Sequence, residues 1–144
     1  MPLRRLLLGT LALAPALLAP AVLPAAATAA PVPLPAPEAM DHLTVTLKDT
    51  SHDGSYDLYC HPAGGTLPDP AAACRQLDQQ TRWGTDPFAP VPAGSDCTMI
   101  YGGPQRAHVT GVWAGRRVNA DFNRLNGCEI ARWNKFSHLL GSSR

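Results

Sequence analysis

A β-hairpin is predicted by residues 106–122, which read RAHVTGVWAGRRVNADF. Between positions 109 and 113 every second residue is apolar or glycine, as in a strand with one buried face. The dipeptide at 114–115, Ala-Gly, suits a tight turn, and apolar alternation resumes over 118–122. We therefore expect two neighbouring strands here.

Two more strands are predicted nearer the N-terminus. Leu, Val and Leu alternate with polar residues over 43–48, which indicates a half-buried strand. Asp53–Gly54 is a tight-turn signal, and the apolar residues of 56–60 then share one face of a second strand. The following stretch, 61–68, is rich in turn-forming residues.

Two helices are expected. Asp69 followed by Pro70 is typical of a helix start, with Asp as the N-cap and Pro at the first helical position, and this helix should run over 70–80. A second, short helix is predicted over 126–133, followed by a last extended piece over 135–140. The predicted order contains mostly strands and two helices, which indicates an antiparallel α+β domain.

The N-terminal region differs in composition from the rest of the chain. Residues 1–29 resemble a signal peptide, with Arg4–Arg5, an apolar run and small residues before the expected cleavage near Ala29. A membrane anchor would need about 20 uninterrupted apolar residues, and prolines break this run. We predict a secreted protein with a Pro-rich, mobile segment at 30–41 and a folded domain at 42–144.

Charge excludes one class of partner. The chain has 12 Lys and Arg against 11 Asp and Glu, a formal net charge of +1. Such a balance argues against a basic nucleic-acid binder. No nucleic acid is therefore expected as a partner, and no membrane once the signal peptide is removed.

Four cysteines remain after cleavage: Cys60, Cys74, Cys97 and Cys128. An even number in an exported chain favours two disulfides, and three pairings are possible. Short loops that do not nest favour Cys60–Cys74 with Cys97–Cys128. No CxxC pair occurs, which argues against a zinc site, so no metal is predicted.

Motifs of catalysis are missing from the sequence. It contains no HExxH, Walker-type or GxSxG pattern. His52–Asp53 lies in a predicted turn, and His61, although next to Cys60, has no partner at metal-ligand spacing. The sequence predicts that the protein is not an enzyme and needs no cofactor.

A long loop precedes the third cysteine. Residues 84–96, GTDPFAPVPAGSD, contain three prolines and two glycines, which excludes a helix or a central strand. Long loops in small domains are usually functional or disordered. This loop runs directly into Cys97, which would anchor its end.

Three short runs around this loop carry a family resemblance. They read CTMIY at 97–101, GVWAGRRV at 111–118 and NGCEI at 126–130. In this order and spacing they resemble the Streptomyces subtilisin inhibitor family of secreted serine-protease inhibitors, over roughly Leu43 to His138. Three differences are visible: many members have Pro where this chain has Thr98, the tract 102–104 is one residue longer than usual, and the tail beyond His138 is also longer.

The resemblance implies a fold and a mechanism. It implies a five-stranded antiparallel sheet with two helices packed on one face, and the disulfides Cys60–Cys74 and Cys97–Cys128. It implies a substrate-like reactive loop with the scissile bond Met99–Ile100, in which Met99 is the P1 residue. The reactive-loop flank would be Asp96, Cys97, Thr98 and Tyr101.

Partners also follow from the resemblance. Subtilisin-like serine proteases are expected, with chymotrypsin-like enzymes as a second class. A homodimer is expected too, paired through the exposed face of the sheet, which we predict to be apolar.

Alternative functions stay open at this point. The chain could be a secreted, disulfide-stabilised binding module without a protease target, using Trp83 and Phe88 for sugars or cell-wall material, or a small secreted hydrolase. Met99 could also be a buried strand residue after Cys97, since Met is common in cores.

Overall fold

The computed structural model describes residues 41–141, so the predicted signal peptide 1–29 and all but the last residue of the segment 30–41 lie outside the described residues. Within them, five strands form one antiparallel sheet in the order β3-β2-β1-β4-β5. The strands are β1 (His42–Lys48), β2 (Gly54–Tyr59), β3 (Gly64–Gly65), β4 (Arg106–Trp113) and β5 (Arg116–Phe122).

The predicted hairpin is confirmed. β4 and β5 pair antiparallel around Ala114–Gly115, with Trp113 opposite Arg116. β1 pairs with both β2 and β4, so the most strongly alternating strand lies at the centre of the sheet. Its three apolar residues, Leu43, Val45 and Leu47, are all buried.

The fifth strand is only two residues long. In β3, Gly65 pairs with Leu58 and Gly64 with Tyr59. An added Cβ on Gly65 would overlap the backbone of Asp57, and its φ is +110°, so glycine is required for this close approach. The residue pattern of 61–68 predicted turns alone, because a glycine pair has no side chains to show alternation.

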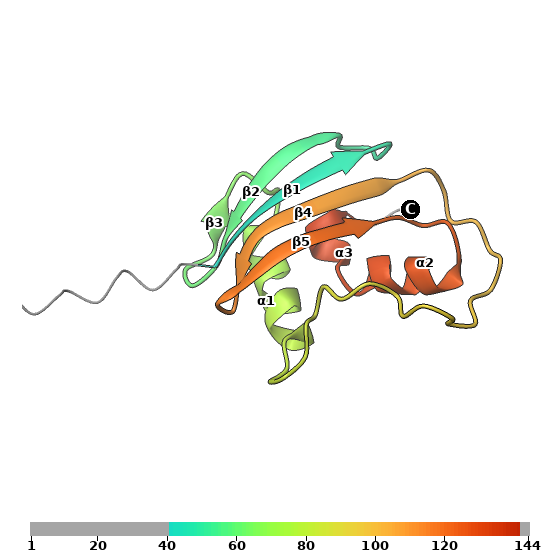
Figure 1. The fold of residues 1–144 in the computed structure, drawn as a ribbon. Coiled ribbons are helices and arrows are strands. Elements are labelled where there is room, and N and C mark those ends of the chain that lie inside the picture. Colours follow the sequence, from blue (N-terminus) through green and yellow to red (C-terminus); the bar gives the residue numbers. More distant parts are fainter. Residues whose placement is uncertain (1–40, 142–144) are drawn as a thin grey trace, which may run out of the picture. The chain divides into compact units, whose positions relative to one another are not determined.

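Three helices cover one face of the sheet (Figure 1). α1 (Pro70–Gln80) begins as predicted, with the Asp69 carboxylate accepting from the Ala72 N–H at 2.9 Å. α2 (Gly127–Asn134) is capped by the Asn126 side chain, which accepts from the Glu129 N–H at 3.0 Å.

The third helix corrects one expectation. Residues 135–140 were predicted to be extended, but α3 occupies Ser137–Leu140. Leu139 and Leu140 are neighbours in sequence and both fully buried, and both amides donate to the carbonyl of Phe136. Two successive buried side chains suit a helical turn, whereas a strand would direct one of them to solvent.

The core lies between the sheet and the helices. Its largest fully buried side chains come from all layers of the domain: Trp133, Phe122, Phe136, Leu43, Leu58, Leu77, Leu139 and Leu140. The predicted disulfide Cys60–Cys74 is confirmed and joins the end of β2 to α1. No helix among residues 41–141 is long and apolar enough to cross a membrane.

The outer face of the sheet is polar, so our expectation of an apolar face is wrong. The Asp57 carboxylate accepts from Thr44 at 3.0 Å and lies 3.2 Å from His42. Nδ1 of His108 lies 2.6 Å from the Asp121 carboxylate. These residues alternate with the buried ones, so the pattern that builds the core also places polar groups outside.

Candidate functional site

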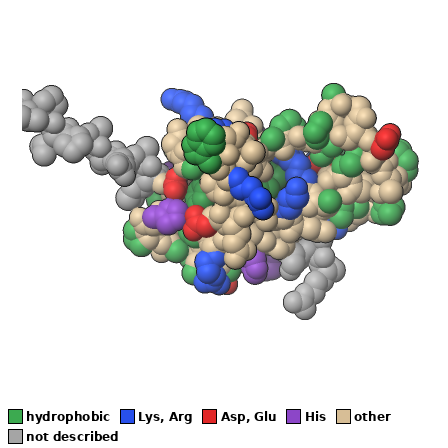
Figure 2. All heavy atoms as spheres, turned by 90° about the horizontal axis from the view of Figure 1, so that it is seen from below, with side chains coloured by type: hydrophobic (Ala, Val, Ile, Leu, Met, Phe, Trp, Pro, Cys, Tyr) green, Lys and Arg blue, Asp and Glu red, His purple; other side chains and the backbone are tan. Residues whose placement is uncertain are grey.

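The predicted reactive bond lies in a highly exposed segment. It belongs to the long connection from α1 to β4, which runs along the helix side and turns back beside α2 (Figure 1). Met99 is 93% exposed, Ile100 61% and Tyr101 64%. Apolar side chains lie at this end of the domain in the space-filling view (Figure 2). The alternative that Met99 is a buried strand residue is therefore wrong.

This segment is fastened to the domain just before Met99. The disulfide Cys97–Cys128 is present, with 5.3 Å between the Cα atoms, which confirms the second predicted pairing. The Gly127 N–H also donates to the Thr98 carbonyl at 2.9 Å. A Cβ on Gly127 would collide with the Thr98 hydroxyl, so the reactive segment and the start of α2 approach as closely as glycine permits.

A second fastening follows Tyr101. The Gly102 N–H donates to the Arg124 carbonyl at 2.8 Å, and the Gly102 carbonyl accepts from Arg124 Nε at 3.1 Å. Between the two fastenings, the backbone of 99–101 makes no hydrogen bond to any other described residue. Its N–H and C=O groups are thus available to pair with an extended strand or cleft of a partner.

The predicted flanking residues differ in exposure. Asp96 and Thr98 are exposed, while Cys97 is half-buried at the point of attachment. The structure therefore brings 96–101 together with 124–128, two segments that are distant in sequence. The sequence predicted the first segment and, of the second, only Cys128.

Arg132 in α2 binds the Pro-rich stretch that precedes this segment. Its guanidinium donates to the carbonyls of Phe88 at 2.8 Å, Ala89 at 2.9 Å and Asp121 at 2.6 Å, and lies 4.0 Å from the centre of the Phe122 ring. Burial lowers the pKa of Arg132, and the nearby Glu129 carboxylate opposes that shift. Nothing in the sequence pattern indicated this residue, because an Arg on a short helix is normally exposed.

Phe88 corrects a further expectation. The sequence allows it to bind sugars together with Trp83, but Phe88 is buried and stacks on Phe136 with 5.3 Å between ring centres. Trp83 is fully exposed. A paired aromatic platform from these two residues is therefore excluded.

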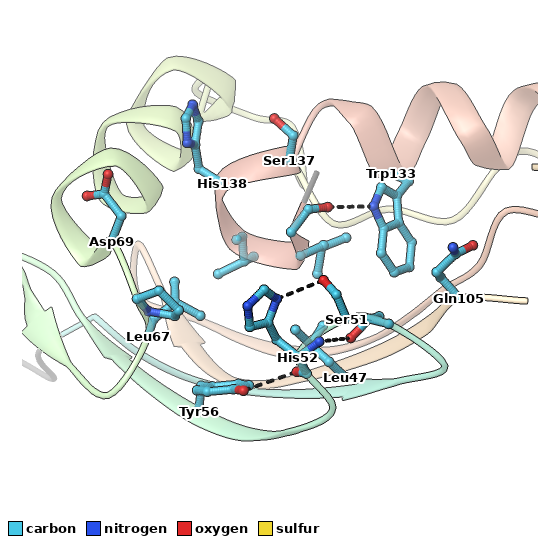
Figure 3. A pocket seen from close by; sticks show the side chains of 15 residues that line it. Leu47, Ser51, His52, Tyr56, Leu67, Asp69, Gln105, Trp133, Ser137 and His138 are labelled. Atoms are coloured by element: carbon cyan, nitrogen blue, oxygen red, sulfur yellow. Dashed lines mark hydrogen bonds between the residues drawn. The ribbon is translucent and has the colours of Figure 1, made fainter. Parts of the chain in front are cut away.

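A cavity of about 410 Å³ lies next to the predicted His52–Asp53 turn (Figure 3). His52 lines it, and its Nδ1 lies 2.8 Å from the Ser51 hydroxyl. The Asp53 carboxylate accepts from the Thr50 N–H at 2.7 Å, a bond that lowers the pKa of Asp53. Asp69, also in the lining, caps α1. Among the residues lining this cavity, no carboxylate orients His52 as a general base would require.

His61 lies between two carboxylates. Its Nδ1 is 3.0 Å from Asp41 and its Nε2 is 3.2 Å from Asp78, and these contacts, that with Asp78 first, raise the pKa of His61. Over residues 41–141, no group of three or more His, Cys, Asp or Glu side chains could hold a metal ion. Through His61, the cluster joins the residue before β1 to α1.

These features define a class: a small α+β domain with two disulfides that presents one extended, exposed segment fastened at both ends. Comparison with known families agrees. The model of the family described as "Subtilisin inhibitor-like" matches residues 38–125. The chain belongs to the subtilisin inhibitor-like family.

Individual relatives are similar over most of their own length. Subtilisin inhibitor-like protein 1 of Streptomyces cacaoi is 38% identical over 80 residues, which cover 52% of this chain and 68% of the relative. Protease inhibitor SIL-V2 of Streptomyces orinoci is 36% identical over 90 residues, 60% of this chain and 81% of the relative. The structure of Streptomyces caespitosus sermetstatin, determined in complex with Bacillus licheniformis subtilisin, matches with a TM-score of 0.40 and 28% identity, covering 70% of this chain and 96% of that one.

Proposed function

We propose that this chain is a secreted inhibitor of subtilisin-like serine proteases that binds like a substrate through the reactive bond Met99–Ile100. The observation that carries the proposal is the position of Met99. It is 93% exposed, in a segment whose backbone is fastened at Thr98 on one side and at Gly102 on the other. Family membership and the relatives named as protease inhibitors agree with this function.

Pre-ordering explains how such a segment would inhibit rather than only be cleaved. A flexible peptide loses conformational freedom when it enters a protease cleft, whereas a fastened loop has lost that freedom already. The unpaired backbone of 99–101 can then add hydrogen bonds to the protease in the manner of an added strand.

The chemistry of Met99 sets the expected target class. Its side chain is unbranched, apolar and flexible, which suits a broad apolar S1 pocket. It carries no charge to pair with the buried acidic group of a trypsin-like pocket. Subtilisin-like enzymes are therefore the proposed partners, and chymotrypsin-like enzymes the second class.

Titration of active-site-quantified subtilisin with the purified mature chain tests the function. We expect stoichiometric loss of activity and a chain that stays largely intact. Rapid degradation of the chain without inhibition would reject the proposal. Turnover of a substrate by the chain alone, without protease, would instead favour a hydrolase.

A binding module remains a second candidate because Trp83 is fully exposed. Arg82 and Arg116 line the same groove as Trp83, so one exposed aromatic ring lies there with two cationic side chains. Trp83→Ala separates the two functions: protease inhibition should be unchanged, whereas retention on cell-wall material, if it occurs, should be lost.

Export and pairing of two chains are part of the proposal. Export follows from the predicted signal peptide 1–29. A homodimer formed through the outer face of the sheet would be joined by polar groups such as Thr44, His108 and Asp121. Sedimentation at micromolar concentration should give twice the mature mass; a monomer alone would reject the dimer.

A further inference from the structure

The side of the segment that follows the expected reactive bond has no disulfide. There Gly102 is held by Arg124, the residue two positions after β5 ends. The Arg124 carbonyl accepts from the Gly102 N–H at 2.8 Å, and its guanidinium Nε donates to the Gly102 carbonyl at 3.1 Å. One residue thus satisfies both polar groups of Gly102, in the tract that is one residue longer than the family resemblance implies.

The Arg124 side chain is itself held by α2. The residue is only 9% exposed, and one guanidinium nitrogen donates to the Asn134 side-chain oxygen at 3.2 Å. The guanidinium also lies 5.9 Å from the centre of the buried Trp133 ring. A planar guanidinium with several fixed donors can hold two partners in one geometry, which a flexible ammonium group does less well.

Packing brings Gly102 close to the same helix. A Cβ added to Gly102 would lie 2.7 Å from Cγ1 of Ile130 and 3.1 Å from the Arg124 carbonyl oxygen. Gly102 is therefore seated against α2 and the 124–126 segment. Only two residues, Ile100 and Tyr101, separate this seat from the reactive bond.

We propose that Arg124 is the positioning residue for the leaving-group side of the reactive bond, holding Ile100 beside Met99 after cleavage so that the bond can be remade. This inference rests on the proposed function. Arg124 does not touch the reacting atoms; it acts through Gly102. Its role complements that of the Cys97–Cys128 disulfide, which holds the Met99 side.

The role of Arg124 depends on how the Met99–Ile100 bond is cleaved and remade. On cleavage, the protease serine oxygen bonds to the Met99 carbonyl carbon, the bond to the Ile100 nitrogen breaks, and the serine proton passes to that nitrogen. In the reverse step the Ile100 amine attacks the same carbon, the ester bond to serine breaks, and an amine proton returns to the serine oxygen. Water competes with the amine for the acyl carbon.

The outcome of that competition depends on the effective concentration of the amine. A short tether keeps it high, and loosening the tether lowers it. Without the Arg124 side chain, the Gly102 carbonyl loses its donor and the released Ile100 end moves away more often. The rate of hydrolysis should then rise relative to the rate of religation. The variant should therefore inhibit the protease only temporarily.

Arg124→Met tests the inference, with Arg117→Met as the matched control because Arg117 is an exposed Arg on β5. Each full mature chain is incubated with a catalytic amount of subtilisin, reduced, and analysed by mass spectrometry for cleavage at Met99–Ile100. We expect Arg124→Met to be cleaved about tenfold faster, and to have a lower ratio of intact to cleaved chain at equilibrium, because a hydrogen bond from a charged group is lost. Arg117→Met should behave as wild type.

Two further variants separate positioning from simple loss of stability. Val109→Ala removes buried volume in the centre of the sheet and should lower the melting temperature without changing the cleavage rate. Asn134→Ala keeps Arg124 but removes its partner at an exposed position, and should speed cleavage several-fold in a chain that folds normally.

The results distinguish the inference from the function on which it rests. If wild type itself fails to inhibit subtilisin, the proposed function falls. If wild type inhibits but Arg124→Met and Asn134→Ala are cleaved no faster than wild type, or no faster than Val109→Ala, the role of Arg124 is overturned and the function stands.

Discussion

The amide N–H of Gly127 donates to the carbonyl oxygen of Thr98 at 2.9 Å, directly beside the disulfide that joins Cys97 to Cys128. The same point of the loop is therefore held twice, once by a covalent bond and once by a backbone hydrogen bond. The hydrogen bond fixes the direction of the carbonyl just before Met99, which a disulfide alone leaves free. Both depend on the start of α2 lying against the loop.

Gly127→Ala should loosen this contact. The added Cβ would collide with the Thr98 hydroxyl, so the loop must shift, although Ala is a better helix former than Gly. We expect the dissociation constant for subtilisin to rise about tenfold, the usual size of an overpacking effect. Inhibition titrations measure it.

Two variants control this experiment. Gly64→Ala adds a Cβ where nothing lies within 4 Å and should leave inhibition unchanged. Thr98→Ala combined with Gly127→Ala removes the colliding hydroxyl and should recover most of the affinity. A double variant as weak as the single one would contradict the steric explanation.

Loss of the Cys97–Cys128 disulfide should turn the inhibitor into a temporary one. In the double variant Cys97→Ala, Cys128→Ala, the core and the Cys60–Cys74 bond remain, so the domain should stay folded, with stability lower by about 3–4 kcal/mol. Circular dichroism follows the fold, and recovery of subtilisin activity over hours follows the loop. Inhibition as persistent as that of wild type would show that the hydrogen bonds hold the reactive loop without the disulfide.

Met99→Lys should add trypsin to the range of inhibited enzymes. The Lys ammonium supplies the charge that a trypsin-like pocket requires, while its aliphatic stem can still enter an apolar pocket. Met99→Asp should damage inhibition of both enzymes, since an unpaired carboxylate would lose its hydration.

Inhibition constants against both enzymes, together with melting temperatures, provide the test. Because Met99 is 93% exposed, neither substitution should change the melting temperature. A stable Met99→Lys protein with an unchanged inhibition profile would show that the reactive bond lies elsewhere.

Stability should fall as the pH rises through the range in which His61 titrates. Contacts with Asp78 and Asp41 raise its pKa above the unfolded value of 6.5, so the protonated ring is bound more strongly in the folded protein. The contribution of protonated His61 to the free energy of unfolding is complete below pH 6.5 and disappears as the pH rises past the raised pKa. The facing Trp113 ring, 5.9 Å away, carries no charge of its own.

Thermal unfolding between pH 5.5 and 8.5 checks this, with His61→Asn compared with wild type. Asn tolerates the positive φ of 60° at this position, so backbone strain does not cause the difference between the variant and wild type. The difference in melting temperature should be largest at low pH and shrink at high pH. A difference for His61→Asn that stays constant over this pH range would refute the role of its charge.

Local patterns in the sequence were enough for the main framework. Alternation over 43–48 and 106–122 gave three of the strands, and the Asp69–Pro70 pair gave the start of α1, because side-chain periodicity and capping act between near neighbours. The two disulfide pairings followed from short loops and from family resemblance, and both are present. The exposed position of Met99 was predicted from the resemblance alone.

Other features depend on contacts between residues that are distant in sequence. β3 exists because Gly65 lets the backbone pass close against Asp57, and α3 because Leu139 and Leu140 both find space in the core. Arg124 meets Gly102 across 22 positions, and Arg132 meets Phe88 across 44. The sequence thus determined which residues alternate, cap and cross-link, but the two buried guanidiniums that fix the loop were decided only by the tertiary structure, since a charged side chain is buried only where folding gathers enough carbonyl oxygens and aromatic rings around it.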